Sequence, residues 1–185
     1  MSIDDLLIQL SQNRIDPAAN SMNSVPESTG LYLVLLKAGV TLPKLFNKVK
    51  FSEFNNSMLL YIGIAGSEKS KRNNLRKRIN DHFEGNNAGK STLRKSIGVI
   101  FGYKLIPRDK NPRTGKTKFS AKDEEQLSNW MKQSLFLYFS QHSTPWTVED
   151  ELIEKYNPPL NLSGNKNTIN ANFREIVSQL RNPIS

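Results

Sequence analysis

Two apolar stretches, GLYLVLL at residues 30–36 and MLLYIGIA at residues 58–65, decide the fold of this chain. Both have the length of a strand and are flanked by turn-forming residues, as buried strands usually are. Each stretch also holds a tyrosine two positions from a glycine, in the triplets Gly30-Leu31-Tyr32 and Tyr61-Ile62-Gly63. We therefore expect two buried strands that bring two tyrosines into one sheet.

Helical patterns follow and separate these strands. Leu75, Ile79 and Phe83 recur at every fourth position, which predicts a helix from about residue 71 to residue 83 with one buried face. Thr144 followed by Pro145 is a good helix start, so we expect a helix from there to about Tyr156. Further helices are expected near residues 1–13, 91–97, 123–133 and 171–181, and a third strand at residues 135–140, LFLYFS. This order predicts a mixed α+β fold with about three strands and helices packed on the sheet.

The chain divides into three segments. Residues 1–29 hold a short helix and a linker rich in Asn, Ser and Pro, residues 30–162 hold the predicted domain, and residues 163–185 form a C-terminal helical extension. A central segment of this size can bury a core of its own.

Composition excludes several classes of site. The chain has 185 residues, no cysteine and two histidines, which rules out disulfide frameworks, thiolate zinc sites and histidine-rich metal cages. Its start, MSIDDLLIQL, carries two aspartates and only a short apolar run, unlike a secretory signal, and no later stretch is long enough to span a membrane. We therefore expect a soluble cytoplasmic protein without a membrane partner.

Positive charge is concentrated in one part of the chain. The formal net charge is +9, and residues 66–118 contain 15 Lys or Arg against 4 Asp or Glu. Such segregation suits a polyanion bound on one face, because each neutralised phosphate releases counterions. A solvated basic surface would have the same composition, and charge alone supports the two interpretations about equally.

Arg78 and His82 form the first candidate pair. They lie four residues apart and share a helix face at the edge of the apolar stripe. A guanidinium stays charged and donates in a fork, which suits a phosphate that gains negative charge. The alternative is a pair of ordinary solvated helix residues, which would have the same spacing.

Glu149 is the candidate metal ligand. It precedes Leu152 and Ile153 by three and four residues, so it points toward the core side of its helix. A buried carboxylate is costly unless something pairs with it, and a divalent cation would do so. The alternative is that Glu149, like Asp150 and Glu151, merely occupies an early helix turn.

Tyr32, Tyr61 and Asn161 are weaker candidates by themselves. Tyrosine ionises near pH 10 and is a poor base unless a nearby cation lowers its pKa. Asn161 follows a Pro-Pro turn, where asparagine is common for backbone reasons, and its functional role would be to orient its neighbours.

Together these elements resemble the GIY-YIG nuclease superfamily. The triplets at 30–32 and 61–63 look like its two name-giving strands, and LRKR at 75–78 is similar to its arginine helix. The motif E-x-x-L-I-x-x-Y-x-P-x-x-N at 149–161 is similar to its closing motif. The resemblance covers roughly residues 30–162, and the ordered set is a strong signal although each element alone is weak. It implies a small, mainly three-stranded antiparallel sheet flanked by helices, with expanded loops and terminal helices.

The resemblance also implies roles for the candidate residues. It places the catalytic arginine at Arg78, the metal-binding glutamate at Glu149 and the bracing asparagine at Asn161. His82 falls where relatives carry tyrosine or histidine, and it is expected to contact the phosphate or assist the leaving group.

One departure from the family pattern affects the expected mechanism. Many relatives carry lysine directly after the second triplet, where this chain has Ile64. The task of deprotonating or positioning the attacking water then falls to Tyr32, with Tyr61 beside it.

The sequence therefore predicts a metal-dependent endonuclease that hydrolyses DNA, with one Mg²⁺ or Mn²⁺ per active site. The expected partner is double-stranded DNA, and a homodimer would allow both strands to be cut. The residues expected to bind the DNA backbone are Lys69, Lys71, Arg72, Arg76, Lys90, Arg94, Lys95, Arg108, Lys110 and Arg113. An alternative, favoured by Ile64, is a catalytically inactive nucleic-acid-binding module of the same fold. A third interpretation is a protein-interaction domain, with the acidic helix at 123–133 and the terminal helices as contact surfaces.

Overall fold

The computed structural model describes residues 2–67, 73–111 and 114–182 of the chain. At its centre lies an antiparallel sheet in the order β1-β7-β2-β4-β3. Its strands are β1 (Arg14–Ile15), β2 (Gly30–Leu36), β3 (Glu53–Phe54), β4 (Ser57–Ala65) and β7 (Leu135–Gln141). A separate small hairpin pairs β5 (Ile106–Pro107) with β6 (Thr117–Lys118). The predicted α+β class and the antiparallel pairing are confirmed.

The central sheet has five strands where mainly three were expected. The three long strands, β2, β4 and β7, are those that the sequence predicts. The two additional strands, β1 and β3, lie at the edges and have two residues each, too few to carry a period-two pattern. Because β3 pairs only with Ser57 and Met58, the rest of β4 has an edge without a neighbouring strand.

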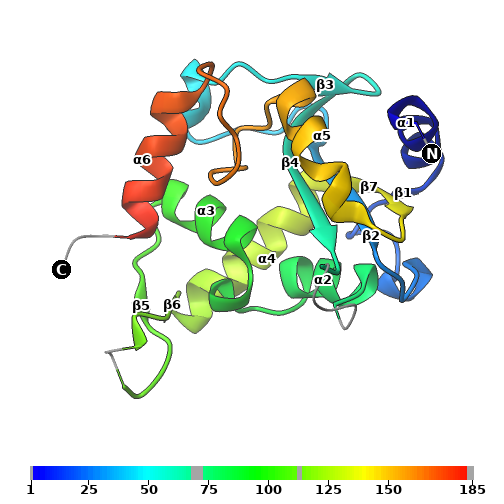
Figure 1. Ribbon diagram of the computed structural model, residues 1–185. Coiled ribbons are helices and arrows are strands. Elements are labelled where there is room, and N and C mark those ends of the chain that lie inside the picture. Colours follow the sequence, from blue (N-terminus) through cyan, green and yellow to red (C-terminus); the bar gives the residue numbers. More distant parts are fainter. Residues whose placement is uncertain (1, 68–72, 112–113, 183–185) are drawn as a thin grey trace.

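Six α-helices are present in the described part of the chain. They are α1 (Ile3–Gln12), α2 (Leu75–Phe83), α3 (Thr92–Ile100), α4 (Ala121–Ser134), α5 (Glu149–Tyr156) and α6 (Ala171–Arg181). Short 3₁₀ segments lie at Met22–Ser24, Lys44–Lys48, Ala88–Lys90 and Pro145–Thr147. Figure 1 shows α6 beside α3 and α5 across β4. None of the described helices is both long and apolar enough to cross a membrane.

The helix expected from Thr144 begins later than predicted. Pro145–Thr147 forms a 3₁₀ turn, and the α-helix starts at Glu149. The side chain of Thr144 makes no capping hydrogen bond to the backbone, so the expected helix start does not form there. The consequence is that Glu149 becomes the first residue of α5.

The alternation of side chains along β2 creates two hydrophobic cores. Tyr32, Val34 and Leu36 belong to a core formed with α2, α3, α4 and α6, whereas Leu31, Leu33 and Leu35 belong to a core formed with α1 and α5. All seven residues of β2 are buried, as expected for a central strand with helices on both faces.

Gly30 is required by the close packing around β2. A Cβ at this position would lie 2.2 Å from the carbonyl oxygen of Ser140 and 2.6 Å from Cδ1 of Leu75. The first of these atoms belongs to the backbone of the neighbouring strand and has no room to move aside. The glycine therefore allows β2, β7 and α2 to approach one another.

Arg94 is not a DNA-binding residue in this structure, which corrects the sequence prediction. Its side chain is fully buried, and its guanidinium donates to the carboxylate of Glu124 at 2.7 Å and to the carbonyl oxygen of His82 at 2.8 Å. Glu124 is also buried and accepts the backbone N–H groups of Ala88 and Phe119. The pair connects α2, α3 and α4. This role could not be predicted from the sequence, where Arg94 is one basic residue in a basic segment.

Replacing Arg94 with Met is expected to lower the free energy of unfolding by about 3–5 kcal/mol, because Glu124 would remain buried without its cation. Urea denaturation monitored by circular dichroism would measure the loss. The double variant Arg94→Met/Glu124→Gln should recover part of it, since a neutral amide needs no cationic partner. A loss below about 1 kcal/mol, typical of an exposed pair, would contradict this role.

Candidate active site

The register of β2 and β4 brings the two predicted tyrosines together. Tyr32 lies opposite Gly63, and Tyr61 lies opposite Val34, one diagonal step along the same face. The ring centroids of the two tyrosines are 6.2 Å apart. Tyr32 is fully buried, whereas Tyr61 is partly exposed and lines a pocket.

Gly63 makes room for the hydroxyl group of Tyr32. A Cβ at Gly63 would lie 2.3 Å from that hydroxyl oxygen and 2.7 Å from Cε1 of Tyr61. The tyrosine of one triplet thus occupies the space left by the glycine of the other. This contact gives the spacing of the two triplets a direct structural reason.

His82 lies behind Tyr32, inside the protein. Its Nε2 atom is 2.6 Å from the Tyr32 hydroxyl and its Nδ1 atom is 2.6 Å from the hydroxyl of Ser91. The Ser91 oxygen also accepts the backbone N–H of Arg94 and so caps α3. Tyr32, His82 and Ser91 therefore form one buried chain of hydrogen bonds.

This chain is electrically neutral. Burial, followed by the positive charges of Arg78 and Arg94, holds the pKa of His82 well below its usual value. Burial likewise raises the pKa of Tyr32 well above the usual tyrosine value. Because His82 has no exposed surface, the expectation that it contacts the phosphate directly does not fit this arrangement.

Arg78 lies one turn before His82 on α2. Its guanidinium interacts with the hydroxyl groups of both Tyr32 and Tyr61, and it donates to the carbonyl oxygen of Lys90 at 3.3 Å. Burial alone would lower the pKa of Arg78. The two tyrosines raise this pKa by more than burial lowers it, so the net shift is upward. The guanidinium thus keeps its charge beside two tyrosines.

Glu149 begins α5 and is partly buried. Burial raises the pKa of its carboxyl group, and Asp150 raises it further, while the charge of Arg78 opposes both effects. Its carboxylate forms no hydrogen bond or ion pair with any residue that the structure describes. It is therefore a carboxylate with a spare binding position for a cation.

Asn161 connects the loop after α5 to the part of the β4 edge that has no neighbouring strand. Its amide oxygen accepts the backbone N–H of Ile62 at 2.9 Å, and its amide nitrogen donates to the carbonyl oxygen of Ile62 at 2.8 Å. Leu160 adds a backbone hydrogen bond to Leu60. These bonds satisfy the strand edge that β3 leaves open and hold α5 beside Tyr61.

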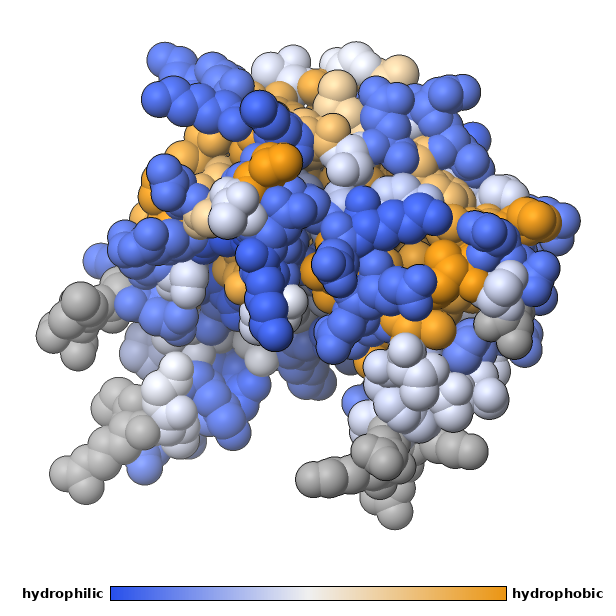
Figure 2. All heavy atoms as spheres, turned by 45° about the horizontal axis from the view of Figure 1, so that its top comes forward, coloured by the Kyte–Doolittle hydropathy of each residue, from blue (hydrophilic) through white to orange (hydrophobic). Residues whose placement is uncertain are grey.

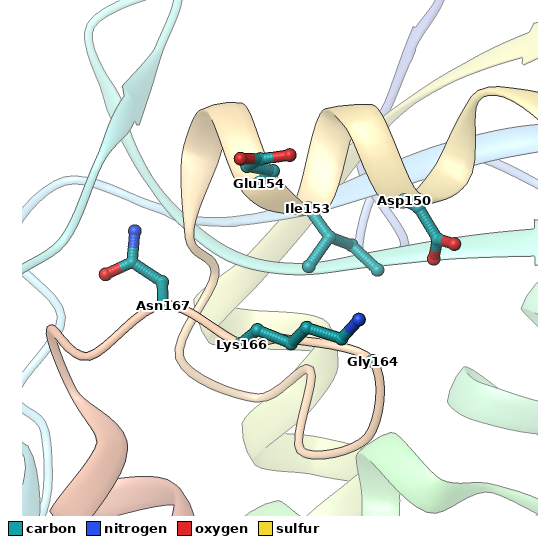
Figure 3. A pocket seen from close by; sticks show the side chains of 6 residues that line it. All are labelled: Asp150, Ile153, Glu154, Gly164, Lys166 and Asn167. Atoms are coloured by element: carbon teal, nitrogen blue, oxygen red, sulfur yellow. The ribbon is translucent and has the colours of Figure 1, made fainter.

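The pocket at this edge has a volume of about 300 Å³. Its walls include Tyr61, Thr92, Glu149, Asn161 and Arg181. An adjoining pocket of about 330 Å³ continues between α5 and the loop that follows it. Figure 3 shows the side chain of Lys166 lying along this second pocket and directed toward Asp150. The two pockets share Asp150, Ile153 and Gly164, so they form one groove.

A family model of the GIY-YIG catalytic domain matches residues 30–183, which include every residue described in this site. The chain belongs to the GIY-YIG family. No curated protein and no solved structure matches it. Membership of this family makes nuclease chemistry the general activity of the fold. The match also extends beyond residue 162 and includes α6.

The basic residues predicted to bind DNA have different positions in the GIY-YIG domain. Lys90 lines a small cavity of about 290 Å³ together with Lys77 and Arg78. Arg76 instead bonds to the carboxylate of Glu27 and to the carbonyl oxygen of Val25. Lys69, Lys71, Arg72 and Arg113 lie outside the described residues.

Three other predicted residues lie near the β5–β6 hairpin or α3. Arg108 pairs with Asp109 and also donates to the carbonyl oxygen of Gly89. Lys110 is exposed, and Lys95 is partly buried on α3. On the face drawn in Figure 2, hydrophilic side chains cover most of the surface, with smaller apolar areas between them.

The site also contains residues that the sequence prediction missed. Ser91 completes the hydrogen-bond chain behind Tyr32, and Thr92 and Arg181 line the pocket. The only sequence signal for Arg181 is its position four residues after Val177 and eight after Phe173, at the end of an apolar stripe.

The raised pKa of Glu149 predicts a pH-dependent stability effect in metal-free protein. When the folded pKa exceeds the unfolded value, the charged carboxylate disfavours folding above the unfolded pKa, and the effect vanishes below it. Glu149→Gln should therefore raise the melting temperature at about pH 8 and leave it almost unchanged at about pH 4. The exposed neighbour Glu151 provides the control substitution Glu151→Gln, which should produce no such gain. Equal behaviour of the two variants would contradict the burial of Glu149.

Proposed function

We propose that this protein is a metal-dependent endonuclease that hydrolyses phosphodiester bonds of double-stranded DNA. The observation that supports this most strongly is the pocket at the open edge of β4. There Tyr61 and Glu149 line one pocket, the Glu149 carboxylate has no partner among the described residues, and Arg78 lies next to Tyr61. Membership of the GIY-YIG family supports the same chemistry.

The residues of the pocket fit one divalent ion. The described part of the chain has no cluster of three or more His, Cys, Asp or Glu side chains that could hold a metal. A single carboxylate completed by water and phosphate oxygens is a usual site for Mg²⁺, and Mn²⁺ accepts the same ligands. The ion, when bound through Glu149, would polarise the phosphate and lower the pKa of a water molecule.

Tyr61, in place of Tyr32, is the tyrosine that we assign to the attacking water. Its ring lines the pocket that contains Glu149, whereas the Tyr32 hydroxyl is buried against His82. A group must lie within hydrogen-bond reach of the proton it accepts or orients. Tyr32 and His82 are then positioning residues, which lie deeper in the protein and orient Tyr61 and Arg78.

Arg78 would stabilise the charge of the transition state. A guanidinium beside two tyrosine hydroxyl groups stays positive as negative charge develops on the phosphate oxygens. Asn161 keeps the loop after α5 against β4, and so maintains the distance between Glu149 and Tyr61.

The DNA backbone would lie along the basic residues that remain exposed. The cavity beside the site is lined by three cations, Lys77, Arg78 and Lys90, against one carboxylate, Asp81, and Lys110 is a further exposed cation. Because one active site cuts one strand at a time, we also propose that cleavage of both strands requires a homodimer.

Ile64 does not favour the inactive alternative in this fold. Its side chain packs with the apolar core on the α1 and α5 side, and it is not among the residues that line the pocket. An apolar residue is the ordinary choice for such a position. The main reason for preferring a module that binds DNA without cutting it is therefore removed.

Cleavage of supercoiled plasmid in Mg²⁺, Mn²⁺ or EDTA tests the proposal. Arg78→Ala and Glu149→Ala should each reduce the rate by about 10²–10³-fold, because each removes charge stabilisation in the transition state. The exposed residues Lys122 and Glu151, which lie outside the proposed binding surface, provide the controls Lys122→Ala and Glu151→Ala, which should retain most of the rate. Full activity of either site variant, or cleavage in EDTA, would refute the assignment. Binding of plasmid without cleavage in any metal would support the inactive alternative instead.

The two tyrosines are expected to respond differently to loss of the hydroxyl group. Tyr61→Phe should lower the cleavage rate by about 10²–10⁴-fold with little change in stability, as for loss of a group that handles a proton. Tyr32→Phe should cost about 1–3 kcal/mol of stability, because the buried Nε2 atom of His82 loses its partner. Single-turnover kinetics measure the cleavage rate, and urea denaturation measures the stability. If Tyr32→Phe lowered the rate and Tyr61→Phe lowered the stability, Tyr32 would be the residue that acts on the attacking water.

A further inference from the structure

Arg181 is a cation that lines the pocket at the open edge of β4. It ends α6, and its side chain reaches the space lined by Tyr61, Glu149 and Thr92. Phe173 and Val177, eight and four residues earlier on the same face, are buried in the core. Apolar packing therefore fixes the position of α6, and this position places Arg181 at the pocket.

The guanidinium of Arg181 has no hydrogen-bond or ion-pair partner among the residues that the structure describes. Its Nε atom is buried and has no hydrogen-bond acceptor among the described residues. Although Glu149 and Asp150 line the same pocket, neither forms an ion pair with it in the described part of the chain. A buried donor without an acceptor costs free energy, which a bound anion would recover.

A second cation, Lys95, lies near Arg181 on the side of α3. Lys95, one turn into α3, is partly buried, and its pKa is lowered by burial and then by the charges of Arg181 and Arg108. The contact between α3 and α6 brings the two cations together. Lys95 also has no carboxylate partner in the described residues. Two neighbouring cations that repel each other form a site for an anion.

A helix C-terminus alone would also favour an arginine. That effect needs only an exposed side chain near the last carbonyl groups. It does not explain why the Nε atom is buried, why the side chain lines the pocket, or why a second cation without a carboxylate partner among the described residues lies near it. These three observations point to a ligand.

We propose that Arg181, with Lys95 beside it, binds a backbone phosphate of the DNA strand next to the phosphate that is cleaved. The inference rests on the proposed nuclease function, since it uses the same pocket, and it extends the substrate-binding surface to α6. The two phosphates would be held by different cations, Arg78 at the scissile position and Arg181 at its neighbour. Arg181 would thereby set the position of the strand relative to Glu149.

Binding without cleavage provides the first test. Fluorescence anisotropy of a labelled DNA duplex in EDTA over a series of salt concentrations measures affinity and its salt dependence. Arg181→Gln should weaken binding roughly tenfold and reduce the slope of log K against log salt by about 1. Arg181→Lys should retain the slope, because the charge remains. Lys122→Gln, which removes one exposed charge on α4, should have a smaller effect. Unchanged affinity and slope in Arg181→Gln, or an equal change in Lys122→Gln, would overturn the proposal.

Cleavage kinetics in Mg²⁺ provide the second test. Arg181→Gln should raise KM with kcat nearly unchanged, because a flanking phosphate is bound equally in the ground state and the transition state. A fall in kcat without a change in KM would place Arg181 at the scissile phosphate and overturn the assignment. Thermal unfolding of each variant excludes loss of folding as the cause.

The two tests separate this inference from the proposed function. If the unmodified protein cuts no DNA in any divalent metal, the nuclease proposal fails, while the salt dependence of Arg181→Gln still decides whether the phosphate site exists. If the unmodified protein cuts DNA and Arg181→Gln binds and cuts as well as it does, only the phosphate site fails.

Discussion

The contact between the Tyr32 hydroxyl and Gly63 is the constraint on which the rest of the site depends. It exists because β2 and β4 pair in the register that sets these two residues opposite each other. A shift by one residue would turn every side chain of β2 to the other face and would exchange the residues that belong to the two cores. The register therefore sets the place of Tyr61, the interaction of both tyrosines with Arg78, and the partner of His82.

The site combines a neutral interior with a charged opening. The chain from Tyr32 through His82 to Ser91 is buried and carries no net charge, which suits a part of the protein whose task is to hold positions. Charged side chains line the pocket, namely Glu149, Asp150 and Arg181, and Arg78 lies next to Tyr61. An anionic strand and a divalent ion would each find charges of opposite sign there.

Much of the fold and part of the site could be predicted from local pattern. The long strands, the α2 stripe and the family resemblance all rest on short-range periodicity and spacing, which the sequence displays directly. Arg78 and His82 were expected on one helix face, and both lie near Tyr32. The two-residue strands β1 and β3 could not be predicted from the sequence. They have no periodic pattern of their own and are strands only because each pairs with a neighbouring strand.

The sequence by itself determined the two triplets, the order of the motifs and the family to which the chain belongs, because these depend on residue identity and spacing alone. Only the tertiary structure decided which charges are exposed. Arg94 and Arg181 look alike in a basic sequence, yet Arg94 forms an ion pair with Glu124 inside the protein, whereas Arg181 lines the pocket and forms no ion pair with the residues that the structure describes. The difference arises from partners that lie far away along the chain and close together in space, and burial makes the presence or absence of such a partner decisive.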